Sequence, residues 1–122
     1  MMIKKILVID DDATSVHLMQ ARLKEKGFEV IVANDGDVGL EKASVINPDL
    51  IILDVEMPRM NGYTFMTALK KDEKLKSTRV IVLTSNKDTA PIFARKGIKV
   101  YLIKPVDFDK LFEAIDMMSQ LS

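Results

Sequence analysis

Residues 50–54 read Leu-Ile-Ile-Leu-Asp, a run of large apolar residues that ends at an aspartate. A run that is apolar throughout is typical of a strand in a parallel sheet, because helices cover both faces of such a sheet. Ile6–Ile9 and Val80–Leu83 are runs of the same composition. We therefore expect these three segments to be strands of one parallel sheet that are covered on both sides.

Two further runs, Glu29–Ala33 and Val100–Ile103, mix polar and apolar residues. This composition favours positions nearer an edge of the sheet or on a partly open face. Helical patterns lie between and after the five runs. Their apolar residues fall at Val16, Met19 and Leu23, at Leu40, Ala43 and Ile46, within 63–71, and at Phe108, Leu111, Phe112 and Ile115. Gly27 and the pair Asn47-Pro48 are typical of helix ends.

A fourth helical candidate, residues 87–96, is weak because it contains Pro91. Proline is tolerated in a helix only in the first turn. Strand and helix nevertheless alternate along the whole chain. This alternation predicts an α/β fold with a doubly wound, five-stranded parallel sheet and five helices, of which the fourth is short or irregular. The length of 122 residues fits one domain, and we expect it to span residues 1–122.

In an open parallel sheet, ligands bind at the carboxyl ends of the strands. The residues that follow the predicted strands are polar, with one proline among them. They are Asp10, Asp11 and Asp12, then Asp54, then Thr84 and Ser85, and finally Lys104 and Pro105. The sequence thus predicts that three carboxylates, a hydroxyl group and an amine converge on one edge of the sheet.

The carboxylates of Asp10, Asp11 and Asp54 would repel one another unless a cation lay between them. Mg²⁺ is suited to such a site, because it prefers carboxylate oxygens and also binds phosphate oxygens. Lys104 would add a positive charge for an anion, and the Thr84 hydroxyl would donate a hydrogen bond to it. This set of groups suits a carboxylate that attacks phosphorus while cations neutralise the transferring oxygens.

The composition argues against several other classes of function. The chain has no cysteine, which excludes disulfides, cysteine-bound zinc and thiol chemistry. Lys plus Arg and Asp plus Glu both number 18, so the net charge gives no reason to expect nucleic acid or a membrane surface as a partner. No glycine-rich phosphate loop follows the first strand. The N-terminal apolar run is too short for a signal peptide or a membrane span, so we expect a cytoplasmic protein.

Four segments of this sequence resemble the receiver domains of response regulators in two-component signalling. They occur in the family's order, cover essentially the whole chain, and read ILVIDDD (6–12), DLIILDVEMPRMNG (49–62), VLTS (82–85) and YLIKP (101–105). Any one segment alone would be a weak signal, whereas the four together are very specific. The resemblance implies a flavodoxin-like fold with strand order 2-1-3-4-5.

The resemblance also implies roles for individual residues. Asp54 matches the family's phosphoacceptor, and Asp10 and Asp11 match the acidic pair that helps to hold Mg²⁺. Glu56 falls where the backbone carbonyl supplies a metal ligand and where the side chain would lie near the phosphoryl group.

Three further positions match residues that respond to the phosphoryl group. Thr84 matches the hydroxyl that turns toward it, and Tyr101 matches the aromatic residue that moves inward with that hydroxyl. Lys104 matches the phosphate-binding lysine, and the Lys104-Pro105 peptide bond is expected to be cis. The implied partners are a sensor histidine kinase or phosphotransfer protein and an unknown downstream protein. The implied protein is not an enzyme, although it assists its own phosphorylation and dephosphorylation.

Other interpretations remain open from the sequence. Asp12 is as well placed to cap the first helix as to act in the site. The segment between Thr84 and Gly97 is shorter than in most receivers, which places the usual output surface around the fourth helix in question. A binding module that acts independently of phosphorylation is therefore the alternative function. A phosphatase or nucleotide-binding enzyme is less favoured, since no second acid is placed for turnover.

Overall fold

The structure is a computed structural model that describes residues 2–56, 62–86, 88, 90–95, 97–98 and 100–120. Strands and helices alternate along the described chain, as the sequence predicts. They are β1 (Lys5–Ile9), α1 (Ala13–Glu25), β2 (Glu29–Ala33), α2 (Gly36–Ile46), β3 (Leu50–Asp54), α3 (Gly62–Lys71), β4 (Arg79–Thr84), α4 (Ala90–Arg95), β5 (Val100–Ile103) and α5 (Phe108–Gln120).

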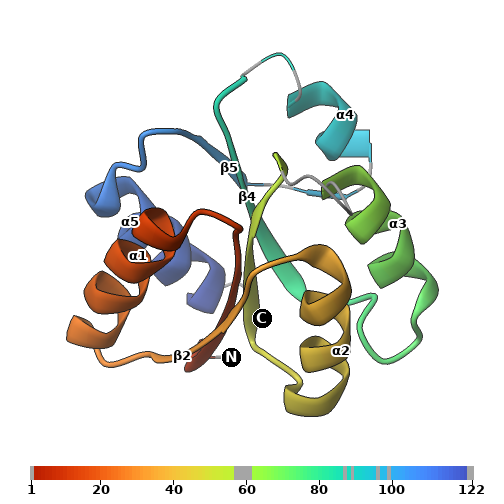
Figure 1. The fold of residues 1–122 in the computed structure, drawn as a ribbon, viewed down its shortest axis with the longest axis horizontal. Helices are drawn as coiled ribbons and strands as arrows, with labels where there is room; N and C mark the ends of the chain where they lie inside the picture. The colour runs from red at the N-terminus through yellow and green to blue at the C-terminus, as the bar shows by residue number, and fades with distance from the viewer. Residues whose placement is uncertain are drawn as a thin grey trace.

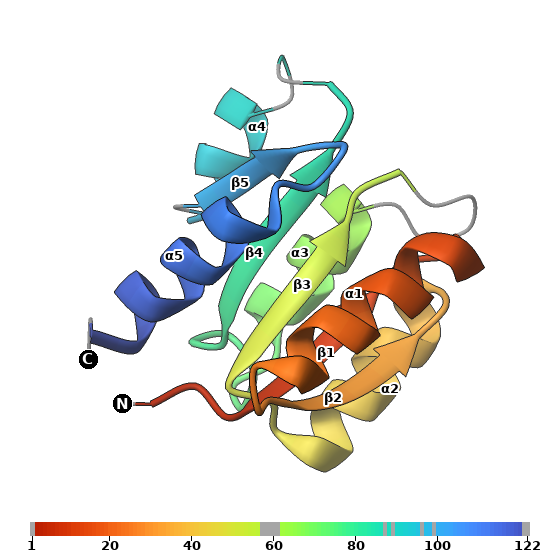
Figure 2. The same ribbon diagram turned by 90° about the vertical axis from the view of Figure 1, so that its left-hand side faces the viewer.

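The sheet has strand order β2-β1-β3-β4-β5, and every neighbouring pair is parallel. Helices α1 and α5 cover one face, and α2, α3 and α4 cover the other (Figures 1 and 2). The predicted fold class and strand order are therefore confirmed. The two mixed runs, β2 and β5, are the edge strands, as their composition indicated.

The burial of the central strand β3 on both faces explains why its first four residues are apolar. Leu50 and Ile52 pack with α1 and α5, whereas Ile51 and Leu53 pack with α2 and α3. All four side chains are fully buried. Successive residues of a strand point to opposite faces, so a strand with helices on both sides has no solvent-facing position for a polar residue.

Helix α1 begins at a cap and ends at a turn that the sequence signals. The Asp12 carboxylate accepts hydrogen bonds from the Thr14 N–H at 3.1 Å and from the Ser15 hydroxyl at 2.9 Å. These bonds lower the pKa of Asp12, the Ser15 hydroxyl most of all. Gly27 follows the helix with φ of 93°, a conformation that glycine adopts without steric cost. The interpretation of Asp12 as a helix cap is confirmed.

We expect the variant Asp12→Ala to unfold at a lower urea concentration than the native protein, because it loses the capping oxygen. Asp12→Asn is the matched control, since it keeps an oxygen that accepts from the Thr14 N–H. Urea unfolding followed by circular dichroism measures both. Equal stability of the two variants would show that the cap contributes nothing.

Helix α4 is short, as the sequence predicts, and it begins late enough that Pro91 lies in its first turn, where proline is tolerated. The outer parts of the predicted range, at residues 87, 89 and 96, lie outside the described residues. Phe93 is 1% exposed and its ring stacks on Tyr63 of α3, with centroids 4.6 Å apart and planes 19° apart. Among the described residues, no helix has the length and apolar character needed to cross a membrane.

Candidate functional site

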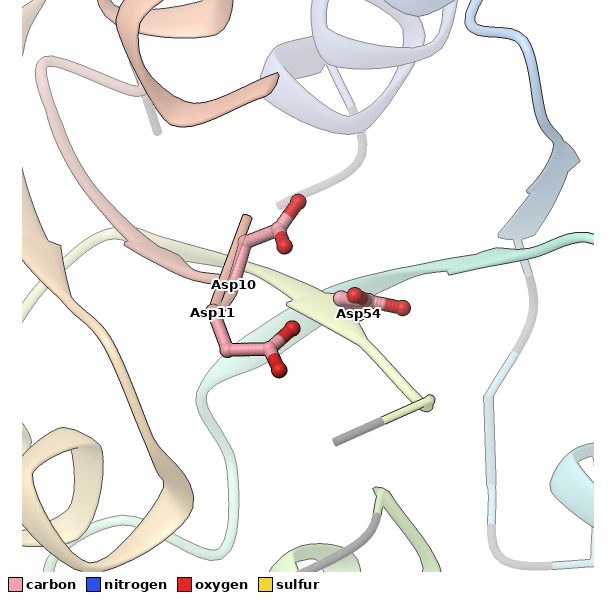
Figure 3. Close-up of side chains that lie close together, drawn as sticks. All are labelled: Asp10, Asp11 and Asp54. Atoms are coloured by element: carbon pink, nitrogen blue, oxygen red, sulfur yellow. The ribbon is translucent and has the colours of Figure 1, made fainter. Parts of the chain in front are cut away.

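Three carboxylates meet at the carboxyl ends of β1 and β3. Asp10, Asp11 and Asp54 each offer one oxygen, and these oxygens all lie within 4.8 Å of one another (Figure 3). Ile9 of β1 pairs in parallel with Leu53 of β3. The next residue of each strand, Asp10 or Asp54, therefore reaches the same level at the edge of the sheet. Asp10 and Asp54 are 3% and 2% exposed, whereas Asp11 is exposed to solvent.

The backbone fixes Asp10 from both sides. Its N–H donates to the carbonyl of Ala33 at 3.1 Å, and its Oδ1 accepts from the N–H of Asp12 at 2.9 Å. Burial raises the pKa of Asp10 to about 6, and the nearby charge of Asp54 adds to the increase, against the lowering effect of the Asp12 N–H. The ionised form of Asp10 therefore lowers the stability of the folded protein at neutral pH unless a cation is near.

Lys104 brings a positive charge to this cluster from the end of β5. Its Nζ lies 2.8 Å from Asp54 Oδ1, and its side chain is 26% exposed. The Lys104 N–H donates to the carbonyl of Thr84 at 2.8 Å, and the peptide bond between Lys104 and Pro105 is cis. Burial alone would lower the pKa of Lys104, but the hydrogen bond and charge of Asp54 outweigh it, and the pKa is raised.

A second polar group joins the ends of β3 and β4. The Glu56 carboxylate Oε1 accepts from the Ser85 N–H at 2.8 Å, from the Ser85 hydroxyl at 2.5 Å and from the Thr84 hydroxyl at 3.3 Å. Thr84 is buried, whereas Glu56 and Ser85 are exposed. The Ser85 hydroxyl bond is the main reason that the pKa of Glu56 is lowered, and the Ser85 N–H bond follows.

The sequence placed Ser85 at the correct edge of the sheet but assigned it no role. The hydrogen bond between the Ser85 and Glu56 side chains joins two loops that are far apart in the chain. The spacing of apolar residues along the sequence does not predict such a bond. The only available signal was that β3 and β4 would be neighbours, each followed by a polar residue. Asp54 and Thr84 are the last residues of these strands rather than the first residues after them.

Tyr101 lies apart from the carboxylates, on the edge strand β5. It is 43% exposed, and it pairs in register with Val82, two residues before Thr84. Its predicted role as a switch residue stays a prediction.

The donors at this edge fit a hard divalent cation. All three clustered groups are carboxylates, which such cations prefer, and two of them are buried. Three carboxylates and the single ammonium of Lys104 leave an excess of negative charge. Like charges held this close are unfavourable without compensation. The three carboxylates therefore suit a hard divalent cation such as Mg²⁺.

Comparisons with known proteins show the family to which the chain belongs. The model of the family described as the response regulator receiver domain matches residues 6–116. Residues 57–61, which are part of the resemblance, lie outside the described residues.

Two relatives come from Pseudomonas aeruginosa. The protein PilH is 32% identical over 114 residues, which cover 92% of this chain and 94% of PilH. The protein PilG is 38% identical over 114 residues, which cover 91% of this chain and 84% of PilG. The structure of the chemotaxis protein CheY4 of Vibrio cholerae has a TM-score of 0.87 at 29% identity, covering 94% of this chain and 98% of that chain. This chain belongs to the response regulator receiver domain family.

Proposed function

We propose that this receiver domain is a phosphorylation switch in which Asp54 accepts a phosphoryl group from a phosphohistidine of a sensor kinase or phosphotransfer protein. One observation carries the proposal. The Asp54 carboxylate is buried beside two other carboxylates and also lies within hydrogen-bond distance of the Lys104 ammonium. A structural ion pair has no need of two extra carboxylates, whereas phosphoryl transfer needs both a carboxylate nucleophile and positive charge around it.

Each residue of the site has a separate role in the phosphoryl transfer. An Asp54 oxygen forms the new bond to phosphorus while the bond between phosphorus and the histidine nitrogen of the donor breaks, and that nitrogen keeps the electron pair. Lys104 neutralises a phosphoryl oxygen, and the Thr84 hydroxyl donates to another. Mg²⁺, held by Asp10, Asp11, Asp54 and the Glu56 backbone carbonyl, would supply further charge neutralisation. We expect no turnover of an external substrate.

The phosphorylated form then acts through a shift in population. An acyl phosphate at Asp54 adds negative charge that attracts the Thr84 hydroxyl, and Tyr101 of β5 follows the movement of Thr84. Such a modification shifts an equilibrium between arrangements that both exist beforehand. A downstream protein that binds one arrangement more tightly reads the change.

Incubation with a small acyl phosphate and Mg²⁺, followed by intact mass measurement, tests the proposal. We expect the protein to gain the mass of one phosphoryl group, a chelator to prevent the gain, and Asp54→Ala to show none. An adduct that persists unchanged in Asp54→Ala would refute the assignment of Asp54.

Magnesium binding is expected to weaken as the pH falls through about 6. The pKa of Asp10 is raised to about 6, so Asp10 takes up a proton in this range and ceases to attract the cation. At pH 5 about a tenth of Asp10 remains ionised, so the affinity should be about tenfold lower than at pH 7. Calorimetric titration with MgCl₂ measures the change. In Asp10→Asn this pH dependence should disappear, and a variant that retains it would show that another group is responsible.

A further inference from the structure

The side chain of Glu56 occupies a small anion-binding corner that the chain itself builds. Its Oε1 accepts from the Ser85 N–H, the Ser85 hydroxyl and the Thr84 hydroxyl, at 2.8, 2.5 and 3.3 Å. The two Ser85 donors, with the Thr84 hydroxyl that the Asn86 carbonyl also approaches to 3.3 Å, favour a negatively charged occupant, because hydrogen bonds to a charged acceptor are stronger than those to a neutral one. Glu56 and Ser85, which form the two shortest of these bonds, are both exposed, so packing against other side chains does not force the contact.

This corner lies beside Asp54. Asp54 pairs in register with Leu83, the residue before Thr84, and the Val55 N–H donates to the Leu83 carbonyl at 3.2 Å. The backbone N–H of Glu56 itself donates to Asp54 Oδ1 at 3.0 Å. The groups that donate to the Glu56 carboxylate therefore lie at the end of β4, beside Asp54.

A phosphoryl group on Asp54 would carry several charged oxygens, and each would need a hydrogen-bond donor or a cation. Lys104 already contacts Asp54 Oδ1. The Thr84 hydroxyl and the Ser85 N–H are the next donors along the same edge. The Ser85 N–H donates to Glu56, and the Thr84 hydroxyl lies 3.3 Å from both the Glu56 carboxylate and the Asn86 carbonyl.

We propose that Glu56 is an internal competitor of the phosphoryl group. Its carboxylate holds the Ser85 loop, and shares the Thr84 hydroxyl with the Asn86 carbonyl, in the arrangement that precedes phosphorylation. The phosphoryl oxygens must displace it before they gain these donors. This inference rests on the proposed phosphorylation of Asp54 and adds a positioning residue that sets how readily the switch responds.

A simpler effect would change the same measurement and must be separated from it. Glu56 also adds a negative charge near the site, which would repel any anion whether or not Glu56 contacts Ser85. The two effects differ in their dependence on Ser85. Competition for donors weakens when the Ser85 hydroxyl is removed, whereas simple repulsion between charges does not.

The experiment uses Mg²⁺ with beryllium fluoride, a stable mimic of the phosphoryl group, titrated into the protein and followed by the amide resonances. Releasing a charged hydrogen bond should raise the affinity of Glu56→Ala by about tenfold relative to the native protein. Glu56→Gln keeps an accepting oxygen without the charge and should fall between them. Glu113→Ala, which removes an exposed glutamate of α5, is the control for surface charge.

A double-mutant cycle decides between the two effects. In the background of Ser85→Ala, replacing Glu56 with Ala should raise the affinity by clearly less than in the native protein. The Ser85 amide proton of the free protein should also move upfield in Glu56→Ala, because it loses a charged acceptor.

Two outcomes would overturn the inference. Glu56→Ala could bind the mimic no more tightly than the native protein, or its gain could be the same with and without the Ser85 hydroxyl. In both cases the native protein binds the mimic, so the proposed function stands. If neither protein bound the mimic, the proposed function would fail and this inference with it.

Discussion

Replacing Lys104 with Met is expected to slow the phosphorylation of Asp54 by at least about a hundredfold, the usual effect of removing one preorganised electrostatic contact. The Lys104 Nζ lies 2.8 Å from Asp54 Oδ1, so it is placed to follow charge from the carboxylate to the transferring oxygens. Methionine keeps most of the apolar stem but carries no charge. The rate of adduct formation, measured by intact mass at fixed donor and Mg²⁺ concentrations, reports the loss.

Lys104→Met should also be less stable, because it leaves the buried Asp54 without its positive partner. Removing one member of a fully buried pair costs about 3–5 kcal/mol, and the partial exposure of Lys104 reduces this to about 1–3 kcal/mol. Lys104→Arg restores the charge but spreads it over a planar group with different reach. It should therefore recover much of the stability and little of the rate.

Lys110→Met is the matched control, because Lys110 is an exposed lysine of α5. Its phosphorylation rate and its free energy of unfolding should equal those of the native protein. If Lys104→Met were phosphorylated as fast as Lys110→Met, Lys104 would have no part in binding the phosphoryl group.

Asp10→Asn is expected to stabilise the metal-free protein by about 1–3 kcal/mol at pH 7. Burial and the charge of Asp54 raise the pKa of Asp10 to about 6 from its ordinary 3.8. Each unit of such a shift corresponds to about 1.4 kcal/mol, so the ionised form costs up to about 3 kcal/mol. Asparagine carries no charge and keeps an oxygen that accepts from the Asp12 N–H.

The same shift fixes how stability depends on pH. The folded protein binds the Asp10 proton more tightly than the unfolded chain does, so this residue makes the protein less stable as the pH rises from about 4 to about 6. In Asp10→Asn that loss should be absent. Added Mg²⁺ should stabilise the native protein more than the variant, since it binds only the complete folded site.

Urea unfolding with and without Mg²⁺ measures these differences. Asp11→Asn is the control, because it removes the same charge from an exposed position of the same cluster. It should stabilise the metal-free protein less than Asp10→Asn. Equal gains would show that repulsion within the cluster, rather than burial, makes Asp10 costly.

The sheet could be predicted from the sequence because burial on both faces leaves a direct mark on composition. Every residue of 50–53 is fully buried, and every one is apolar. The placement of Asp10, Asp54 and Lys104 followed from the same reasoning, since parallel strands bring their carboxyl ends to one edge. These features depend on the order of strands and on little else.

The hydrogen bonds of Glu56 could not be predicted in this way. Its side chain is long enough to point toward several neighbours, and its choice of Ser85 depends on the final separation of two loops. The first and last residues of α4 could not be predicted either, because few apolar residues mark this helix in the sequence. Its buried residue Phe93 stacks on Tyr63 of α3 and packs in the core on this face of the sheet.

The stack of Phe93 on Tyr63 has a mechanical consequence for α4. Of the residues from Pro91 to Arg95, Phe93 alone is buried, and the others face solvent. A change in the position of Tyr63, at the start of α3, would therefore reach α4 through the Phe93 ring and alter the surface that the exposed residues of α4 present to a bound protein.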